Sequence, residues 1–183
     1  MVFFSGGNNL LDPKKVFEHV TIPPRGMVAD LGCGGAGHFV LPAAKVVGNN
    51  GLVYAVDIQK IVLASVISRA RLMGISNIKT VWTNLEIVGA AKIPADSLDV
   101  AFLINTLFMS KKHDKIMEEA KRLLKPDGQL LVIDWTKISN GLGPALDDRV
   151  DPARIKQIGQ QLGLSLTETF EAGPFHFGLV FKK

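Results

Sequence analysis

Cysteine is nearly absent from this sequence, and long apolar runs and a secretion signal are missing altogether. Cys33 is the single cysteine, so no disulfide framework can form within the chain, and its expected role is packing. No apolar run reaches the roughly eighteen residues of a membrane-spanning helix. Residues 1–13 lack the basic start and the long apolar stretch of a signal peptide. These absences predict a soluble protein of a reducing cytoplasm, without a membrane segment.

Strong charge is also lacking. The formal net charge is +4, and the basic residues are scattered apart from Lys111, Lys112 and Lys115. That cluster is interpreted as the solvated start of a helix, with a small basic binding patch as the alternative. The sequence therefore gives no strong signal for nucleic-acid binding. His113 and Asp114 have no second group of ligands nearby, so no metal site is predicted.

The length of 183 residues suits one domain with a full hydrophobic core. We expect residues 1–183 to form a single domain, in which residues 1–22 are an N-terminal arm with a short helix. Asp12 and Pro13 predict the start of that helix, because they supply an N-cap and a proline in the first turn.

Apolar strands and amphipathic helices alternate along the body of the chain. The strands are apolar almost throughout, as expected where both faces of a parallel sheet are covered, and are predicted at residues 27–31, 52–57, 78–83, 98–104 and 129–135. The helices between them are predicted from apolar faces at Phe39, Ala43, Val46 and Val47, at Ile61, Ala64, Ser65 and Ser68, and at Ile116, Ala120, Leu123 and Leu124. Residues 85–96 contain no convincing helix. The pattern predicts an α/β protein with a parallel sheet wrapped by helices.

The last third of the chain follows a different pattern. A helix is predicted to begin at Asp151-Pro152 and to end at Gly163. Residues 164–170 and 175–181 resemble strands, and the turn between them is too short for a parallel crossover. The sheet is therefore expected to have seven strands, mostly parallel, with an antiparallel hairpin strand at its C-terminal end.

A glycine-rich turn follows the first predicted strand, and its pattern is ambiguous. Gly32, Gly34 and Gly37 form a literal G-x-G-x-x-G, and Asp57 follows at the end of the next strand, as in proteins that bind NAD. Two observations argue against NAD. Asp30 stands two residues before the first glycine, where a dinucleotide fingerprint usually has an apolar residue, and Tyr54, the only tyrosine, begins no Tyr-x-x-x-Lys pair.

Four segments together resemble the class I S-adenosylmethionine-dependent methyltransferases, near the menaquinone-type C-methyltransferases. They are VADLGCG, VYAVDIQ, SLDVAFLINTLF and RLLKPDGQLLVIDW, and the resemblance runs from about Asp12 to Phe181. It implies a Rossmann-like, doubly wound fold, S-adenosyl-L-methionine as the cofactor, and methyl transfer to an unidentified acceptor.

The resemblance also implies where the cofactor binds. Asp30 would hold the ammonium group and Asp57 the ribose hydroxyls, while Asn84 replaces the acid that often faces the adenine amine and can accept through its amide oxygen. The glycine turn departs from the family pattern, because Ala36 stands where the third glycine is usual and the loop is one residue longer. The full set of expected cofactor residues is Asp30, Gly32, Cys33, Gly34, Gly37, Asp57, Ile58, Asn84, Leu85 and Asn105.

Methyl transfer from a sulfonium is an in-line displacement, so the enzyme mainly aligns donor and acceptor and needs no catalytic residue. If the acceptor carries a proton, His176 is a weak candidate for the general base, and a packed, hydrogen-bonded histidine is the alternative. Arg149 is interpreted as a solvated loop residue or as a partner of an acidic substrate. Residues 2–11, with Phe3 and Phe4, are either a flap over the site or a frayed terminus, and a homodimer is another way to close it.

Two other functions remain open at this point. The first is a non-catalytic module that binds the cofactor or its product, which differs from an enzyme by its lack of turnover. The second is a small NAD-dependent reductase, which would bind NADH and not S-adenosylhomocysteine.

Overall fold

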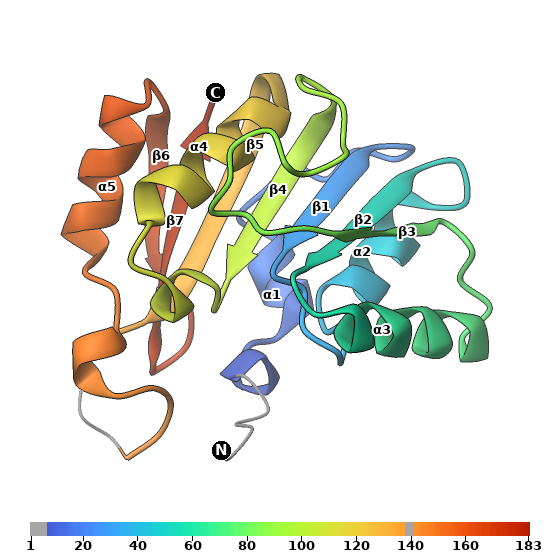
Figure 1. The fold of residues 1–183 in the computed structure, drawn as a ribbon, viewed down its shortest axis with the longest axis horizontal. Coiled ribbons are helices and arrows are strands. Elements are labelled where there is room, and N and C mark those ends of the chain that lie inside the picture. Colours follow the sequence, from blue (N-terminus) through green and yellow to red (C-terminus); the bar gives the residue numbers. More distant parts are fainter. Residues whose placement is uncertain (1–6, 138–140) are drawn as a thin grey trace.

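The chain folds around a seven-stranded sheet with the strand order β3-β2-β1-β4-β5-β7-β6 (Figure 1). In this computed structural model, residues 7–137 and 141–183 are described. The strands are β1 (Met27–Leu31), β2 (Leu52–Asp57), β3 (Ile78–Trp82), β4 (Leu98–Ile104), β5 (Leu124–Trp135), β6 (Ser165–Glu171) and β7 (His176–Lys182). β3, β2, β1, β4 and β5 run parallel, whereas β7 runs antiparallel to both of its neighbours, β5 and β6. The predicted fold class is confirmed.

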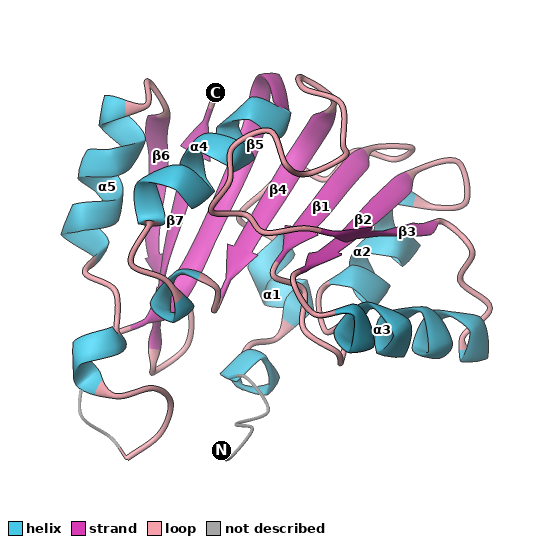
Figure 2. Ribbon diagram, viewed as in Figure 1, coloured by secondary structure: helices cyan, strands magenta, loops and turns pink. Residues whose placement is uncertain are grey.

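Helices cover both faces of the sheet (Figure 2). One face packs against α1 (Pro13–Phe17), α2 (Val40–Val47) and α3 (Lys60–Leu72), and the other against α4 (His113–Leu123) and α5 (Pro152–Gln161). Short 3-10 helices occur at η1 (Gly7–Leu10), η2 (Leu107–Met109) and η3 (Leu146–Asp148). Because both faces are covered, adjacent residues of one strand belong to different core clusters: Val28 packs with α2 and Ala29 with α4 and α5.

The C-terminal hairpin forms as the short turn predicts. The amide of Ala172 donates to the carbonyl of His176 at 3.0 Å, and β7 returns between β5 and β6. Residues 85–96, expected to lack a long helix, contain only turns and bends in the structure.

Several details of the sequence prediction are wrong. Of the α3 residues that were expected to pack, Ile61, Ala64 and Ser68 face outward, and Ser65 is half-buried against the glycine turn. The buried residues are Leu63, Val66 and Ala70. Val46 of α2 is half exposed. β5 begins at Leu124 rather than Gln129, since Leu124 pairs with Leu98 before a bulge, although Pro126 and Asp127-Gly128 resemble a turn.

The N-terminal arm packs against one face of the sheet. The Asp12 side chain accepts a hydrogen bond from the Lys14 amide at 2.9 Å, and Val16 and Leu11 are buried in the same cluster as α2. The helix ends at Phe17, two residues earlier than expected. Phe3, Phe4 and the rest of residues 1–6, on which the flap prediction partly depends, lie outside the described residues.

Candidate functional site

The glycine turn lies where the carboxyl ends of β1 and β2 meet. The amides of Gly32 and Cys33 donate to the Val56 carbonyl at 2.8 and 3.0 Å, which fixes the turn against the end of β2. The Gly34 amide donates to Oδ2 of Asp57 at 3.3 Å. Ligands of open parallel sheets bind at this edge, and the structure brings the first group of predicted cofactor residues together there.

Asp57 keeps part of its hydrogen-bonding capacity for a ligand. Its Oδ1 accepts from the Gln59 amide at 2.9 Å, and its Oδ2 accepts from Gly34. A carboxylate can accept about four hydrogen bonds, so both oxygens retain a lone pair. The side chain is only partly buried, so a ligand can reach it.

The extra residue of the glycine turn lengthens the loop before α2, and the helix itself is not altered. The Gly37 amide donates to the Gly34 carbonyl at 3.3 Å and closes one turn, and the Leu41 amide donates to the Gly37 carbonyl at 3.0 Å. α2 starts only at Val40. The Ser65 hydroxyl on α3 donates to the Gly35 carbonyl at 2.9 Å and supports the turn from outside.

Gly32 and Gly34 are glycine for different reasons. Gly32 has φ +91°, and a Cβ there would lie 2.5 Å from Oγ1 of Thr106. Gly34 has φ +62°, and a Cβ there would meet no atom within 4 Å. The backbone of Gly32 therefore lies close to the Thr106 side chain, whose hydroxyl donates to the Leu31 carbonyl at 2.9 Å. Gly34 instead borders open space, where a ligand can approach its backbone.

Asp30 is a buried carboxyl group with an unsatisfied oxygen. Its side chain is 2% exposed, and its Oδ2 has no hydrogen-bond partner among residues 7–137 and 141–183. Burial, followed by the negative charge of Asp57, raises the pKa of Asp30 to about 7. A cation beside it would reverse both effects.

Asn105 follows β4 and also holds an unsatisfied oxygen. It adopts φ +53°, its amide donates to the Ile133 carbonyl at 2.8 Å, and its Nδ2 donates to Oδ1 of Asn8 at 2.8 Å. Its Oδ1 is buried, and no group in the described part of the chain donates to it. η1 of the N-terminal arm thus contacts the end of β4, and His38 makes a second link to the arm through its Nε2, 2.8 Å from the Leu11 carbonyl.

The remaining predicted cofactor residues lie after β2 and β3. Ile58 is 58% exposed, and its carbonyl accepts from the Trp82 indole at 2.9 Å. Oδ1 of Asn84 accepts from the Glu86 amide at 2.9 Å, so one of its two lone pairs is already used. Leu85 is buried in the core.

Cys33 packs in the core beside the turn. It is 1% exposed, and burial, followed by the charges of Asp30 and Asp57, raises the pKa of its thiol far above the usual range. The thiol therefore stays protonated and unreactive, in agreement with the packing role expected for it.

His176 does not have the surroundings of a general base. It is 1% exposed, and its ring centre lies 4.3 Å from that of Trp135. Within the residues that the structure describes, neither ring nitrogen has a hydrogen-bond partner. Burial, followed by the positive charge of Arg149, lowers its pKa to about 4. The alternative was a packed, hydrogen-bonded histidine. The structure confirms that His176 is packed, but its ring makes no hydrogen bond to the described residues.

Arg149 is not a solvated loop residue. It is 5% exposed and donates to the carbonyls of Thr136, Pro144 and Leu142, so it fastens the segment between β5 and α5. Its guanidinium also lies 5.5 Å from the centre of the Trp135 ring.

Two buried acids, Asp134 and Glu119, were not predicted as structural anchors. Asp134, fully buried at the end of β5, accepts from the amides of Leu107 and Phe108 at 3.0 and 3.2 Å and from its neighbour Trp135 at 2.8 Å. Burial raises its pKa to about 7 despite these bonds. It fixes the segment that follows Asn105.

Glu119 has the same role for the segment after β3. It is fully buried on α4, accepts from the amides of Gly89 and Ala91 at 2.7 and 3.1 Å, and pairs with Arg122 at 2.7 Å. The sequence did contain a sign of this ion pair, because Glu119 and Arg122 are three residues apart on an otherwise apolar helix face.

Other kinds of site find no support in the part of the chain that is described. No three His, Cys, Asp or Glu side chains of residues 7–137 and 141–183 gather to hold a metal ion. Within the same residues, no helix is both long and apolar enough to cross a bilayer. An open cleft of about 540 Å³ lies between α3 and β3, and none of the predicted cofactor residues lines it.

The strand order, the reversed β7 and a glycine turn between two acids define a Rossmann-like fold of the methyltransferase type. The chain belongs to the methyltransferase-domain family: the family's model, described as "Methyltransferase domain", matches residues 25–162. S-adenosyl-L-methionine is the cofactor that this membership implies.

Individual relatives agree with this assignment. The chain is 33% identical over 141 residues to the ubiquinone/menaquinone biosynthesis C-methyltransferase UbiE of Hydrogenovibrio crunogenus, covering 75% of this chain and 53% of that protein. It therefore spans about half the length of the curated relatives it matches. A solved SAM-dependent methyltransferase from Aquifex aeolicus superposes with a TM-score of 0.86 at 26% identity, covering 96% of this chain and 92% of that one.

A third relative shows the limit of what the fold alone says. The [4+2]-cyclase SpnF superposes with a TM-score of 0.79 at 16% identity, covering 96% of this chain and 80% of that one. The same fold thus occurs in a protein named for a different reaction, so the function must be argued from the site.

Proposed function

We propose that this chain binds S-adenosyl-L-methionine at the carboxyl ends of β1, β2 and β4 and transfers its methyl group to an acceptor. One observation carries the proposal: two buried acceptors beside the glycine turn, Oδ2 of Asp30 in β1 and Oδ1 of Asn105 directly after the neighbouring strand β4, accept no hydrogen bond from residues 7–137 and 141–183. Buried polar atoms are almost always paired, so two such atoms at one sheet edge indicate a missing cationic or donor group. The ammonium group of the cofactor carries three N–H donors and a positive charge.

The other side chains fit the rest of the cofactor. The two carboxylate oxygens of Asp57 each have a free lone pair for a ribose hydroxyl. Open space beside Gly34 lets the ligand approach the backbone of the turn. Ile58 offers exposed apolar surface for the adenine ring, whereas Leu85 is buried and anchors the segment after β3 in the core. Asn84 retains one lone pair for the adenine amine, although we expect a weaker contact than an acid would make. Gly32, Cys33 and Gly37 hold the turn in shape.

Methyl transfer from a sulfonium requires the protein mainly to bind and orient the two reactants. When bound, the cofactor supplies a methyl group on a sulfonium, which is already an activated leaving group. The chain's own contribution is to fix the donor through Asp30, Asp57 and Asn105 and to shield it from water. The pKa and burial of His176 do not favour proton transfer by that residue, so we assign no general base.

The acceptor is proposed only by analogy. The curated relatives are named for C-methylation in ubiquinone and menaquinone biosynthesis, which makes a precursor of those quinones the first acceptor to test. The acceptor stays unassigned until such a test succeeds.

The proposal is tested by turnover. The protein is incubated with S-adenosylmethionine and either a demethylated quinone precursor or fractions of a cell extract, and release of S-adenosylhomocysteine is followed. Cofactor-dependent release that Asp57→Asn lowers about ten- to a hundredfold at limiting cofactor concentration would support methyl transfer. Tight binding without release in any fraction would favour the non-catalytic module, and binding of NADH in place of S-adenosylhomocysteine would favour a reductase.

A further inference from the structure

The outward side of α3 presents large apolar side chains to solvent. Ile61 is 77% exposed and Leu72 is 87% exposed, one near each end of the helix. Between them Ala64 and Ser68 are also exposed, and the four positions lie on one stripe of the helix. The opposite stripe, which includes Val66, is buried against the sheet. α3 is therefore apolar on the side that faces the core and partly apolar on the side that faces away from it.

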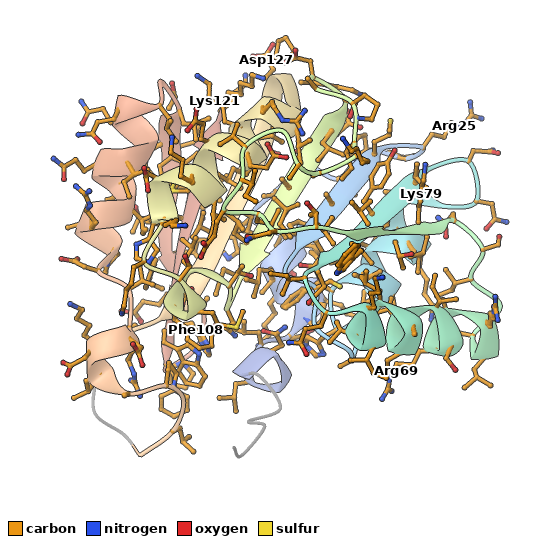
Figure 3. The ribbon with its side chains drawn as sticks, in the orientation of Figure 1. Arg25, Arg69, Lys79, Phe108, Lys121 and Asp127 are labelled. Carbon is orange, nitrogen blue, oxygen red and sulfur yellow. The ribbon has the colours of Figure 1, made fainter. Side chains whose placement is uncertain are left out.

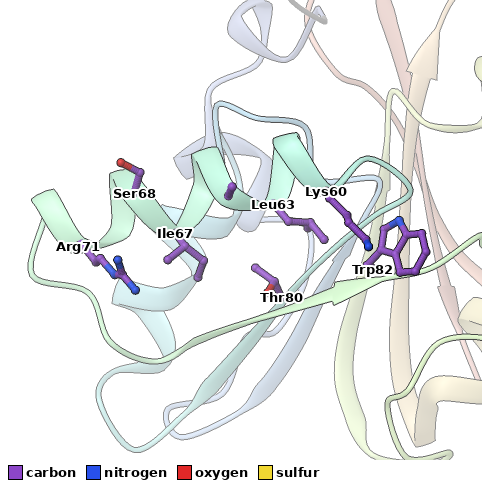
Figure 4. A pocket seen from close by; sticks show the side chains of 8 residues that line it. Lys60, Leu63, Ile67, Ser68, Arg71, Thr80 and Trp82 are labelled. Atoms are coloured by element: carbon purple, nitrogen blue, oxygen red, sulfur yellow. The ribbon is translucent and has the colours of Figure 1, made fainter.

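Basic residues flank this outward stripe. Lys60 and Arg71 line the cleft between α3 and β3 (Figure 4), and Arg69 points away from the sheet (Figure 3). In the described residues none of the three forms an ion pair. Residues 58–84 contain four Lys or Arg residues and no Asp or Glu. The positive charge of this face is thus not neutralised by its own segment.

Trp82 extends the same surface onto the edge strand. It is 60% exposed on β3, and Nζ of Lys60 lies 4.1 Å from the centre of its ring. Ile58 is exposed beside it and accepts its indole hydrogen bond. We call these residues together the α3 surface: Lys60, Ile61, Arg69, Arg71, Leu72 and Trp82.

We propose that the α3 surface binds the face of a lipid bilayer that contains anionic lipids. A helix that lies in the interface has an apolar stripe with basic residues along its flanks, and α3 has this arrangement on its outward side. Each Lys or Arg near an anionic surface adds attraction, and Trp is enriched at the level of the lipid headgroups. α3 lies at the periphery of the fold, at the β3 end of the sheet, where a flat surface can reach it (Figure 1).

Other occupants fit the α3 surface less well. A second copy that paired through the same surface would bring Lys60, Arg69 and Arg71 against the same cations, which is repulsive. An acidic protein would need a groove to receive Ile61 and Leu72, because both project from the crest of a helix. A single-stranded nucleic acid would have to compete with Lys60 for the face of Trp82.

The test is co-sedimentation of the intact chain with vesicles, without cofactor, so that the result does not depend on methyl transfer. Vesicles of phosphatidylcholine alone are compared with vesicles in which one third of the lipid is phosphatidylglycerol. We expect binding only to the anionic vesicles, and its loss at about 1 M salt, where the Debye length falls to about 3 Å.

Variants separate a specific surface from general charge attraction. Arg69→Gln/Arg71→Gln is expected to weaken the partition at least roughly tenfold, since each cation near such a surface contributes about fivefold. Ile61→Ser/Leu72→Ser is expected to weaken it by a similar factor, because it removes exposed apolar area. The matched control Arg154→Gln/Lys156→Gln removes the same charge from α5, at the other end of the sheet, and should bind like wild type (Figure 1).

The proposal is overturned by any of three results. These are equal binding to both kinds of vesicle or to neither, equal losses in the α3 and α5 charge variants, and unchanged binding of Ile61→Ser/Leu72→Ser. Far-ultraviolet circular dichroism and thermal unfolding of every variant confirm that exposed substitutions leave the fold intact.

Discussion

Asp30 and Asp57 lie near the carboxyl ends of the neighbouring parallel strands β1 and β2, with the glycine turn between them in sequence. Asp30 is buried, and its burial together with the negative charge of Asp57 raises its pKa to about 7. Two acids placed this close form a site that favours a cation, since Oδ2 of Asp30 accepts no hydrogen bond from the described part of the chain.

The first prediction concerns the pH dependence of stability. An acid whose pKa rises from 3.8 to about 7 on folding binds more protons in the native than in the unfolded state, so its contribution to stability is lost as the pH rises from about 4 to about 7. Asp30→Asn removes this pH-dependent loss of stability, because an asparagine side chain does not titrate. Relative to wild type, its free energy of unfolding should increase by on the order of 2–4 kcal/mol between pH 4 and pH 8.

Urea unfolding of both proteins across that pH range checks this prediction. Asp147→Asn, an exposed acid on η3, serves as the control and should track wild type at every pH. A constant difference between Asp30→Asn and wild type would show that Asp30 titrates normally. The difference from wild type must be used because two other buried groups change stability in the same pH range, Asp134 with the same sign and His176 with the opposite sign.

The second prediction concerns His176. Its pKa falls from 6.5 to about 4 on folding, so the native state binds fewer protons and stability is lost as the pH falls through that window. His176→Phe should abolish the loss, and its stability relative to wild type should increase by on the order of 2–3 kcal/mol from pH 7 to pH 4.

The same variant decides the catalytic role of His176 once an acceptor is known. A packed histidine without hydrogen bonds can be replaced by Phe with little change in turnover. A fall of about a hundredfold or more in kcat, with an altered pH profile, would instead establish His176 as a general base.

The third prediction separates backbone strain from cofactor contact in the glycine turn. Gly34 and Gly74 have φ of +62° and +66°, and a Cβ at either position meets no atom within 4 Å. Gly34→Ala and Gly74→Ala should therefore each destabilise the fold by about 1–2 kcal/mol. Only Gly34→Ala should weaken the binding of S-adenosylhomocysteine, as measured by calorimetry. Equal affinities in the two variants would mean that the ligand does not approach Gly34.

The fourth prediction concerns the buried anchor on α4. Although burial raises the pKa of Glu119, its hydrogen bonds with Arg122 and with the amides of Gly89 and Ala91 hold it below the usual value. Glu119→Ala leaves these donors without an acceptor and should destabilise the fold by about 3 kcal/mol.

Hydrogen exchange should then accelerate at the amides of Gly89 and Ala91. Glu118→Ala, which removes a neighbouring exposed acid that pairs with Lys115, is the control and should cost less than about 1 kcal/mol. Undisturbed exchange in Glu119→Ala would show that the segment after β3 is held by other contacts.

Much of the fold follows from local patterns in the sequence. Apolar runs locate β1 to β4, and the short turn after Glu171 requires a reversed β7, because no parallel crossover fits in it. The outward side of α3 was mistaken for the packed side because small residues such as Ala64 and Ser68 satisfy a helical period on either side. Leu63, the residue that packs, lies outside the stripe that was chosen.

The site could be predicted only in part, for a similar reason. Asp30, Asp57 and the glycines are close in sequence and carry a recognisable spacing. Asn8 meets Asn105 and Thr106 meets Gly32 only because the fold brings distant segments together, and no local pattern encodes such a contact. The absence of any partner for Oδ2 of Asp30 is likewise a property of the folded chain.

Titration calorimetry of S-adenosylhomocysteine tests the central claim most directly, with wild type, Asp57→Asn and the control Asp147→Asn. Charged hydrogen bonds to two hydroxyls predict a loss of about ten- to a hundredfold in affinity for Asp57→Asn, no loss for the control, and no binding of NADH by any of the three. Undiminished affinity in a folded Asp57→Asn, or binding of NADH in place of S-adenosylhomocysteine, would contradict the account.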